Sequence, residues 1–289
     1  MKINHLIVIF LLYAINSYTQ HSRIFTDSEN KLKIWFDSLF KRNEVKYLLP
    51  DSLKILYSDS IFNELSYILK QNNAFTYKFK TIKNIGDITS ADSLVRIITW
   101  NIKLKNNHFL YYGFILYREN ITDERSKVFE LIDKSDSLDE QNNIENEILN
   151  HKKWYGATYY QIGLYTHKGR KYYLLIGWDG YSAYTNRKIV EVLTFTQKGK
   201  PIFGKTNFIS PEKNTRRLIF THSIKASMSC IYDDKKKAII FDHLVPSSPI
   251  YKNMYEFYGP SGTYDGYFLK GNTWIFKEDI ETKNPPPKN

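Results

Sequence analysis

The side chains that could perform acid–base chemistry in the C-terminal half are Asp179, Asp242, His243 and Asp265. Asp179 stands between Trp178 and Gly180, so its carboxylate would lie beside an aromatic platform. That arrangement suits sugar recognition or acid–base chemistry on a glycoside. Asp-Gly is also an ordinary turn former, with the tryptophan buried beneath it. The residue types favour the turn.

Asp242 and His243 are adjacent at the end of an apolar segment, and Asp265 follows after the next loop. A carboxylate beside an imidazole could form a catalytic pair or part of a metal site. Neighbouring residues on a strand point to opposite faces, however, so Asp242 and His243 cannot easily serve one centre. Metal-binding runs such as His-x-His and His-Glu-x-x-His are absent. The sequence predicts neither a metal site nor a cofactor.

Cys230 is the only cysteine, and together with His222 it could act as a nucleophile with its base. It alternates with polar residues in the same pattern as Ala226 and Met228, which places it on the apolar face of a strand. A buried, unreactive thiol is therefore predicted. Neither Gly-x-Ser-x-Gly nor Gly-x-Gly-x-x-Gly occurs, and neither a hydrolase nor a nucleotide site is predicted from motifs.

A group of aromatic and basic residues provides the candidates for binding: Trp178, Tyr181, Lys168, Arg170 and Lys171. Aromatic faces interleaved with bases bind sugars or single-stranded nucleic acid. Tyrosines also fill the cores and rims of β structures, which is the alternative interpretation. Because the chain is predicted to be exported, nucleic acid is not expected as a partner.

The prediction of export rests on residues 1–19. Lys2 precedes an apolar run over residues 6–14, and a polar stretch follows, which is the order of regions in a secretory signal peptide. The apolar run has about nine residues, whereas a membrane-spanning helix needs about 20. We expect cleavage before Gln20 and a periplasmic or secreted protein that does not span the membrane. Without a cysteine in the signal, a lipid anchor on an N-terminal Cys is not expected.

Positive charge is concentrated in the C-terminal half. Residues 20–150 carry 18 Lys and Arg against 19 Asp and Glu, and residues 151–289 carry 22 against 11. Many of these cations fall at predicted hairpin tips: Lys168, Arg170, Lys171, Lys198, Lys200, Lys235, Lys236 and Lys237. Tips that share one end of the fold would form a positive rim attractive to anionic polymers. Alternatively, drift in an AT-rich coding sequence explains the charge, and the turn lysines only discourage edge pairing.

Hydrophobic periodicity predicts helices first and strands afterwards. An apolar stripe predicts a helix from Asp27 or Ser28 to residue 40, and a second helix runs from Ser58 or Asp59 to residue 70, with Pro50 as the break between them. Strands are predicted over residues 75–79, 94–102 and 109–117. The charged stretch 120–153 is expected to be a surface helix or a connector.

Four hairpins are predicted after residue 154, each with a polar turn that frees the backbone. Their strands are 155–165 with 172–177, 189–196 with 202–208, 227–232 with 238–241, and 264–269 with 273–276. The fold class is therefore α+β, mainly antiparallel β in a meander, sandwich or barrel, with a small helical N-terminal portion. The expected divisions are a signal peptide (1–19), helices plus strands (20–150), a β-hairpin domain (151–281) and a disordered tail (282–289).

Several short motifs resemble those of a family of exported bacterial proteins of unassigned function. They cover about the last two thirds of the chain: Ile98-Thr99-Trp100-Asn101, Trp154-Tyr155-Gly156-Ala157, Gly177-Trp178-Asp179-Gly180, Lys225-Ala226-Ser227-Met228-Ser229, Phe241-Asp242-His243-Leu244, Tyr258-Gly259-Pro260 and Tyr264-Asp265-Gly266. The resemblance implies export and a β-rich body, and it transfers no catalytic residue.

These features predict a non-enzymatic binding or structural component of the bacterial cell envelope, with an anionic envelope polymer or a glycan as its partner. The alternative is a hydrolase of an envelope or environmental polymer that uses carboxylates such as Asp179, Asp242 or Asp265. A pocket that holds two of these carboxylates within about 10 Å would favour the enzyme. Scattered carboxylates on a flat face would favour the binding protein.

Overall fold

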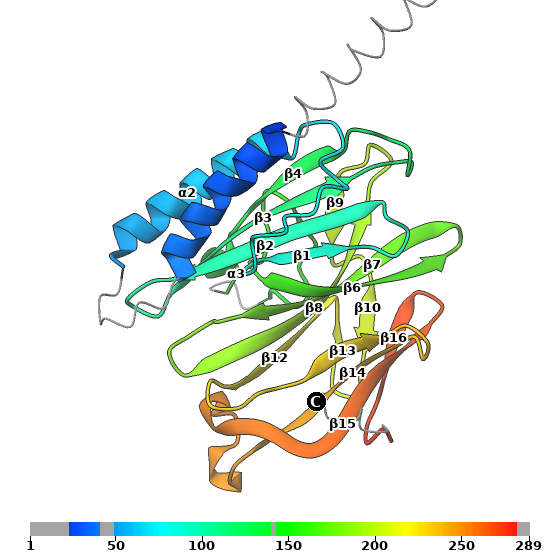
Figure 1. Cartoon of the computed structure of the whole chain (residues 1–289). Helices are drawn as coiled ribbons and strands as arrows, with labels where there is room; N and C mark the ends of the chain where they lie inside the picture. Colours follow the sequence, from blue (N-terminus) through cyan, green and yellow to red (C-terminus); the bar gives the residue numbers. More distant parts are fainter. Residues whose placement is uncertain (1–22, 41–48, 140–142, 282–289) are drawn as a thin grey trace, which may run out of the picture. The chain divides into compact units, whose positions relative to one another are not determined.

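A computed structural model of the chain describes residues 23–40, 49–139 and 143–281 (Figure 1). The predicted signal peptide and tail lie outside the described residues. The chain divides into two compact units, one up to Asn84 together with residues 124–126, and one from Ile85 onward without them. The expected boundary at residue 150 falls within the second unit.

The first unit contains two helices, over residues 23–40 and Asp51–Ile68 (α2). Leu32 and Phe36 of the first helix are buried, as are Ile61 and Leu65 of α2, which confirms both apolar stripes. Helix α2 begins seven residues earlier than expected, directly after Pro50. Proline presets the backbone φ angle that a helix start requires, so here it marks a beginning and not only a break.

Residues 75–79 of the first unit form a turn and irregular chain, and the predicted strand is absent there. Their alternating aromatic residues have another cause. Phe75 and Phe79 are buried, and the ring of Tyr77 stacks on that of Phe25 at 4.5 Å between centroids. A loop that packs its aromatic side chains on a helix can imitate the period of a strand.

The second unit consists of three β-sheets, and its mainly antiparallel pairing confirms the predicted fold class. The first sheet has the order β1 (Gly86–Thr89), β2 (Val95–Lys103), β3 (Phe109–Tyr117) and β4 (Lys127–Ile132). The central sheet has the order β5 (Leu149–Asn150), β9 (Pro201–Phe203), β8 (Thr185–Phe195), β7 (Arg170–Asp179) and β6 (Thr158–His167), and β12 (Arg217–Ser223) also pairs with β8. The third has the order β11 (Asn214–Thr215), β10 (Asn207–Ile209), β16 (Thr273–Lys277), β15 (Tyr258–Lys270), β14 (Ala238–Pro246) and β13 (Cys230–Asp233).

The turns of all four predicted hairpins are confirmed, in β6–β7, β8–β9, β13–β14 and β15–β16. The predicted strand over residues 202–208 is wrong in its extent: β9 ends at Phe203, the backbone turns at Gly204 with a φ of 82°, and residues 207–209 form β10 of the third sheet. The charged stretch 120–153 contains more structure than expected, namely β4, the short helix α3 (Ser135–Asp139) and β5. Only Leu131 of β4 is buried, because this strand is the edge of its sheet. A strand with one buried side chain carries almost no alternation to detect.

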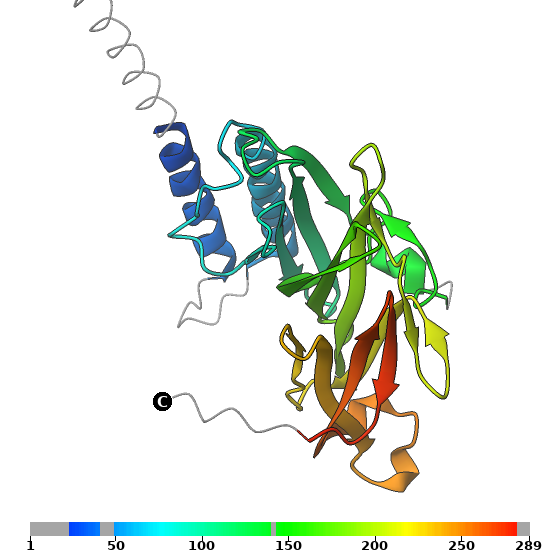
Figure 2. The same ribbon diagram turned by 90° about the vertical axis from the view of Figure 1, so that its right-hand side faces the viewer.

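The central sheet is covered on both faces (Figures 1 and 2). On β7, Tyr173 and Leu175 belong to the core shared with the first sheet, whereas Leu174 and Ile176 belong to the core shared with the third. Because consecutive side chains of a strand point to opposite faces, β7 must be apolar at consecutive positions, and it is.

Strand β6 connects the three sheets through a bulge between Tyr159 and Gln161. On one side the backbone N–H of Tyr159 donates to Oγ1 of Thr99 in the first sheet, at 3.0 Å. On the other, the Gln161 amide donates to the carbonyl of Tyr232 in β13 and accepts from its N–H, both at 2.8 Å. The Gln161 side chain thus satisfies the backbone N–H and carbonyl of Tyr232, which a neighbouring strand would otherwise bond.

Candidate functional site

The four hairpin turns gather at one end of the second unit, which we call the turn end. Its turns are residues 168–169, 196–200, 234–237 and 271–272. The antiparallel pairing of Tyr173 with Leu193 brings the β6–β7 and β8–β9 turns to one end of the central sheet. The pairing of Ala238 with Phe268 does the same for the two turns of the third sheet. The turns lie on the right-hand side of Figure 1, the side that Figure 2 brings toward the viewer.

The two sheets meet at this end. A Cβ atom placed on Gly271, in the β15–β16 turn, would lie 3.6 Å from Cε1 of His167 at the end of β6. The N–H of Leu269 donates to the carbonyl of Lys237 at 3.0 Å, which ties the last two turns together. The condition for a single positive rim, that neighbouring tips share one end, is therefore met.

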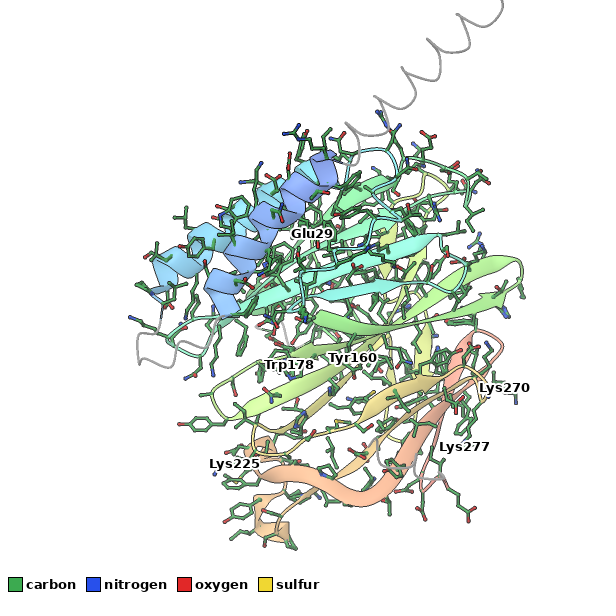
Figure 3. All side chains as sticks on the ribbon, viewed as in Figure 1. Glu29, Tyr160, Trp178, Lys225, Lys270 and Lys277 are labelled. Carbon is green, nitrogen blue, oxygen red and sulfur yellow. The ribbon has the colours of Figure 1, made fainter. Side chains whose placement is uncertain are left out.

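Positive charge at the turn end exceeds what its acids neutralise. Asp92 pairs with Lys171 at 2.9 Å, and Asp234 pairs with Lys237 at 2.7 Å. Asp233 accepts from the backbone N–H groups of the next turn residues. Seven exposed cations have no carboxylate partner within the described part of the chain: Lys168, Arg170, Lys198, Lys200, Lys235, Lys236 and Lys270. Figure 3 shows Lys270 projecting from this end.

The predicted binding residues divide between two ends of β7. Lys168, Arg170 and Lys171 lie at the turn end, and Trp178 and Tyr181 lie at or beyond the far end of the strand. A ten-residue strand spans about 30 Å, so the two groups cannot contact one small ligand. Lys171 is paired with Asp92, as described above.

Asp179 is buried, with 4% of its surface exposed. Its carboxylate accepts from the hydroxyls of Tyr111 at 2.7 Å and Tyr155 at 3.2 Å, and from the N–H of Tyr181 at 3.0 Å. Burial raises the pKa of this carboxyl above its ordinary value. The residue organises the β7–β8 turn, and the aromatic neighbour Trp178 stays half-buried against Phe109.

His243 and Asp265 form a pair, with 2.7 Å between Nδ1 and Oδ2. The other oxygen of Asp265 accepts the N–H of Asp279 at 3.1 Å. Asp242 belongs to neither contact, because its carboxylate accepts the N–H of Ser229 at 2.6 Å. The ladder shifts register between Asp242 and Leu244, leaving His243 outside it. The three candidate aspartates thus have separate partners, and within the described ranges no group of three His, Cys, Asp or Glu could hold a metal ion.

The predicted burial of Cys230 is confirmed: 2% of its surface is exposed, and it lies in the core between the central and third sheets. Burial raises the pKa of this thiol to about 12. At pH 8 only about one thiol in ten thousand would then be ionised, against roughly one in four for a free cysteine. His222 does not activate this thiol, because no hydrogen bond joins the two side chains among the described residues, and Nδ1 of His222 lies 2.9 Å from the carbonyl oxygen of Ser223.

We therefore expect a thiol reagent at pH 8 to leave Cys230 unlabelled in the native protein and to label it completely in denaturant. Labelling followed by intact mass gives the result directly. A native rate close to that of a free thiol would place the residue at the surface and contradict its assignment to the core.

Residues 199–206 match the Gly-x-x-x-x-Gly-Lys-Thr pattern of phosphate-binding loops, a match that the prediction of no nucleotide site overlooks. In such a loop, free backbone N–H groups surround the phosphate and a helix follows. Here β9 occupies the middle of the pattern and pairs with β8 and β5. Thr206 is buried against the hydroxyl of Tyr165 at 3.0 Å, and the following strand is β10. The match is one of residue types alone.

None of the helices in the described ranges is both long enough and apolar enough to cross a membrane. Comparison of the chain with models of protein families, with curated proteins and with solved structures finds no match.

Proposed function

We propose that this chain is an exported binding protein of the bacterial cell envelope, and that its turn end holds an anionic polymer. The observation that carries the proposal is the set of seven exposed cations without carboxylate partners, gathered by four turns at one end. Export is supported by the signal-peptide order of residues 1–19.

The construction of the turn end suits a polymer with repeated negative charges. Each turn joins two strands that pack in the cores on either side of the central sheet, so the backbone beneath the cations is held in place. One exposed cation contributes little to the binding free energy. The contributions of several cations add when they contact the same polymer chain. Exposed charges are screened beyond about 8 Å at physiological salt, so the binding is expected to weaken as salt rises.

Two other interpretations predict different results. Turn lysines also discourage edge pairing and keep a protein in solution, which requires no ligand. The hydrolase alternative requires two carboxylates at one centre. Asp242 and Asp265 have separate partners, and Asp179, whose partner Tyr155 also contacts Asp139 at 3.4 Å, is buried.

The test compares two variants with the same net charge. One replaces four cations of the turn end by glutamine: Lys168, Arg170, Lys235 and Lys236. The other replaces four exposed lysines by glutamine in connections at the end of the second unit opposite the turn end: Lys105, Lys134, Lys225 and Lys252. Figure 3 shows the separation between Lys225 and Lys270.

We expect the turn-end variant to bind immobilised dextran sulfate and polygalacturonate at least about tenfold more weakly at low salt, since each cation near an anionic surface contributes up to about 1 kcal/mol. The control variant should bind as the parent does, and neutral dextran should retain none of them. Equal losses in both variants would mean that net charge and not the turn end determines retention, and the proposal would then fail.

A further inference from the structure

A second feature of the same unit lies away from the turn end. A pocket of about 320 Å³ opens where β8, β12, η2 (Tyr255–Phe257) and the segment before β5 meet. We call it the Arg187 pocket. Arg187 of β8 lies opposite Asp179 of β7 in the strand register. Asp179 is at the end of β7 farthest from the Lys168 turn, so this pocket is separate from the cations of the turn end.

Arg187 is held firmly in the wall of the pocket. Its Nη1 donates to Oδ1 of Asp139 at 2.8 Å and to the hydroxyl of Tyr155. The ring of Tyr181 covers the guanidinium, with 3.1 Å between Cζ and the ring centroid. Behind this layer, Asp179 accepts from both Tyr155 and the N–H of Tyr181. The buried carboxylate therefore fixes the two tyrosines that position the guanidinium.

The charges that line the pocket cancel in pairs. Arg187 faces Asp139, and Lys213 faces Glu145 at 2.7 Å. Among the residues that the structure describes, an ionic ligand would find no surplus charge here. Hydrogen-bonding capacity is nevertheless left over, because a guanidinium has five N–H donors and a carboxylate about four acceptor positions. The amide of Asn146 also lines the pocket. Such a lining suits a neutral ligand that both donates and accepts many hydrogen bonds.

Two aromatic rings stand at this pocket, Tyr181 and Tyr255, with 41% and 46% of their surfaces exposed. A partly exposed ring offers an apolar face on which the C–H side of a sugar ring can rest, while the hydroxyls of the sugar reach the polar wall. The volume lies at the lower end of the range of about 300–1,000 Å³ found for ligand pockets, which limits the ligand to a small one.

We propose that the Arg187 pocket binds a neutral saccharide unit of one or two rings. This binding is independent of the anionic polymer at the turn end, because the two sites share no residue.

The test measures binding of glucose, galactose, N-acetylglucosamine and cellobiose by saturation-transfer NMR and calorimetry, with glucuronate and galacturonate as charged counterparts. We expect at least one neutral sugar to bind saturably at millimolar concentration and its uronate to bind more weakly. Tyr181→Ala and Tyr255→Ala should each weaken that binding about tenfold. Tyr184→Ala is the matched control, since Tyr184 is 72% exposed and does not line the pocket.

Three results would overturn the proposal: no saturable binding by any neutral sugar, tighter binding of the uronates, or equal affinity in the Tyr181, Tyr255 and Tyr184 variants. All three tyrosines are exposed at the surface, so the variants should fold, and their thermal unfolding would confirm it. The polymer-binding variants provide a further check, because neutralising the turn end should leave saccharide affinity unchanged.

Discussion

Glu191→Gln is expected to lower the free energy of unfolding by about 3–5 kcal/mol, because it leaves a buried guanidinium without its counter-charge. Glu191 and Arg217 pair between β8 and β12 with both side chains fully buried. Nε and Nη2 of Arg217 lie 2.8 Å and 2.7 Å from Oε2. The hydroxyl of Tyr159 donates to the other carboxylate oxygen, and Arg217 also donates to the carbonyl of Ile144. Urea unfolding measures the change.

Two further variants test whether the loss of stability comes from the unpaired, buried guanidinium of Arg217. Glu145→Gln removes one partner of the Lys213 pair, which is much more exposed, and should change stability by less than about 1 kcal/mol. The double substitution Glu191→Leu with Arg217→Met should recover much of the loss, since apolar residues of similar volume can replace a buried pair. If Glu191→Gln proved as mild as Glu145→Gln, water would have to reach the Arg217 guanidinium, and the buried network described here would be wrong.

Trp274→Ala is expected to cost about 3–5 kcal/mol, the range for a large aromatic side chain removed from a closed core. Trp274 has no exposed surface and lies between the central and third sheets. Its ring contacts those of Tyr165 and Tyr232 edge-on, at 5.5 Å and 6.1 Å between centroids. It also stacks on Phe208, at 6.3 Å. Because strands from both sheets surround the ring, the cavity cannot close by the movement of one segment.

Trp178→Ala provides the comparison within the same protein. Trp178 is only half-buried and lies edge-on to Phe109, at 5.5 Å between centroids, so its loss should cost less than about 2 kcal/mol. Urea unfolding of both variants, with the slope compared to confirm a similar unfolding reaction, gives the difference. Equal costs would show that the core between the two sheets is open enough to collapse around the missing ring.

The candidate sites were only partly predictable from the sequence. Lysines at turns can be recognised because turn residues are local, and so Lys168, Lys198 and Lys235 could be named without a structure. Their meeting at one end depends on strand order. Asp179 is the reverse case: Trp178-Asp179-Gly180 is visible as a local motif, but the contacts of Asp179 with Tyr111 and Tyr155 join residues 68 and 24 positions apart. The Arg187 pocket carried no local signal, since its lining comes from four separate segments.

Features that depend on neighbours along the chain follow from the order of the residues alone: the first helix, predicted from Asp27 or Ser28 to residue 40, the four hairpin turns, and the burial of Cys230. The way these elements combine depends on contacts between distant parts of the chain. Strand β12 joins the central sheet by pairing with β8, and the Gln161 side chain of β6 bonds the edge of β13. His243 reaches Asp265 beside a register shift in β14. Alternation and turn chemistry act over a few residues, whereas sheet order and charge pairing are determined by contacts between segments that lie far apart in the sequence.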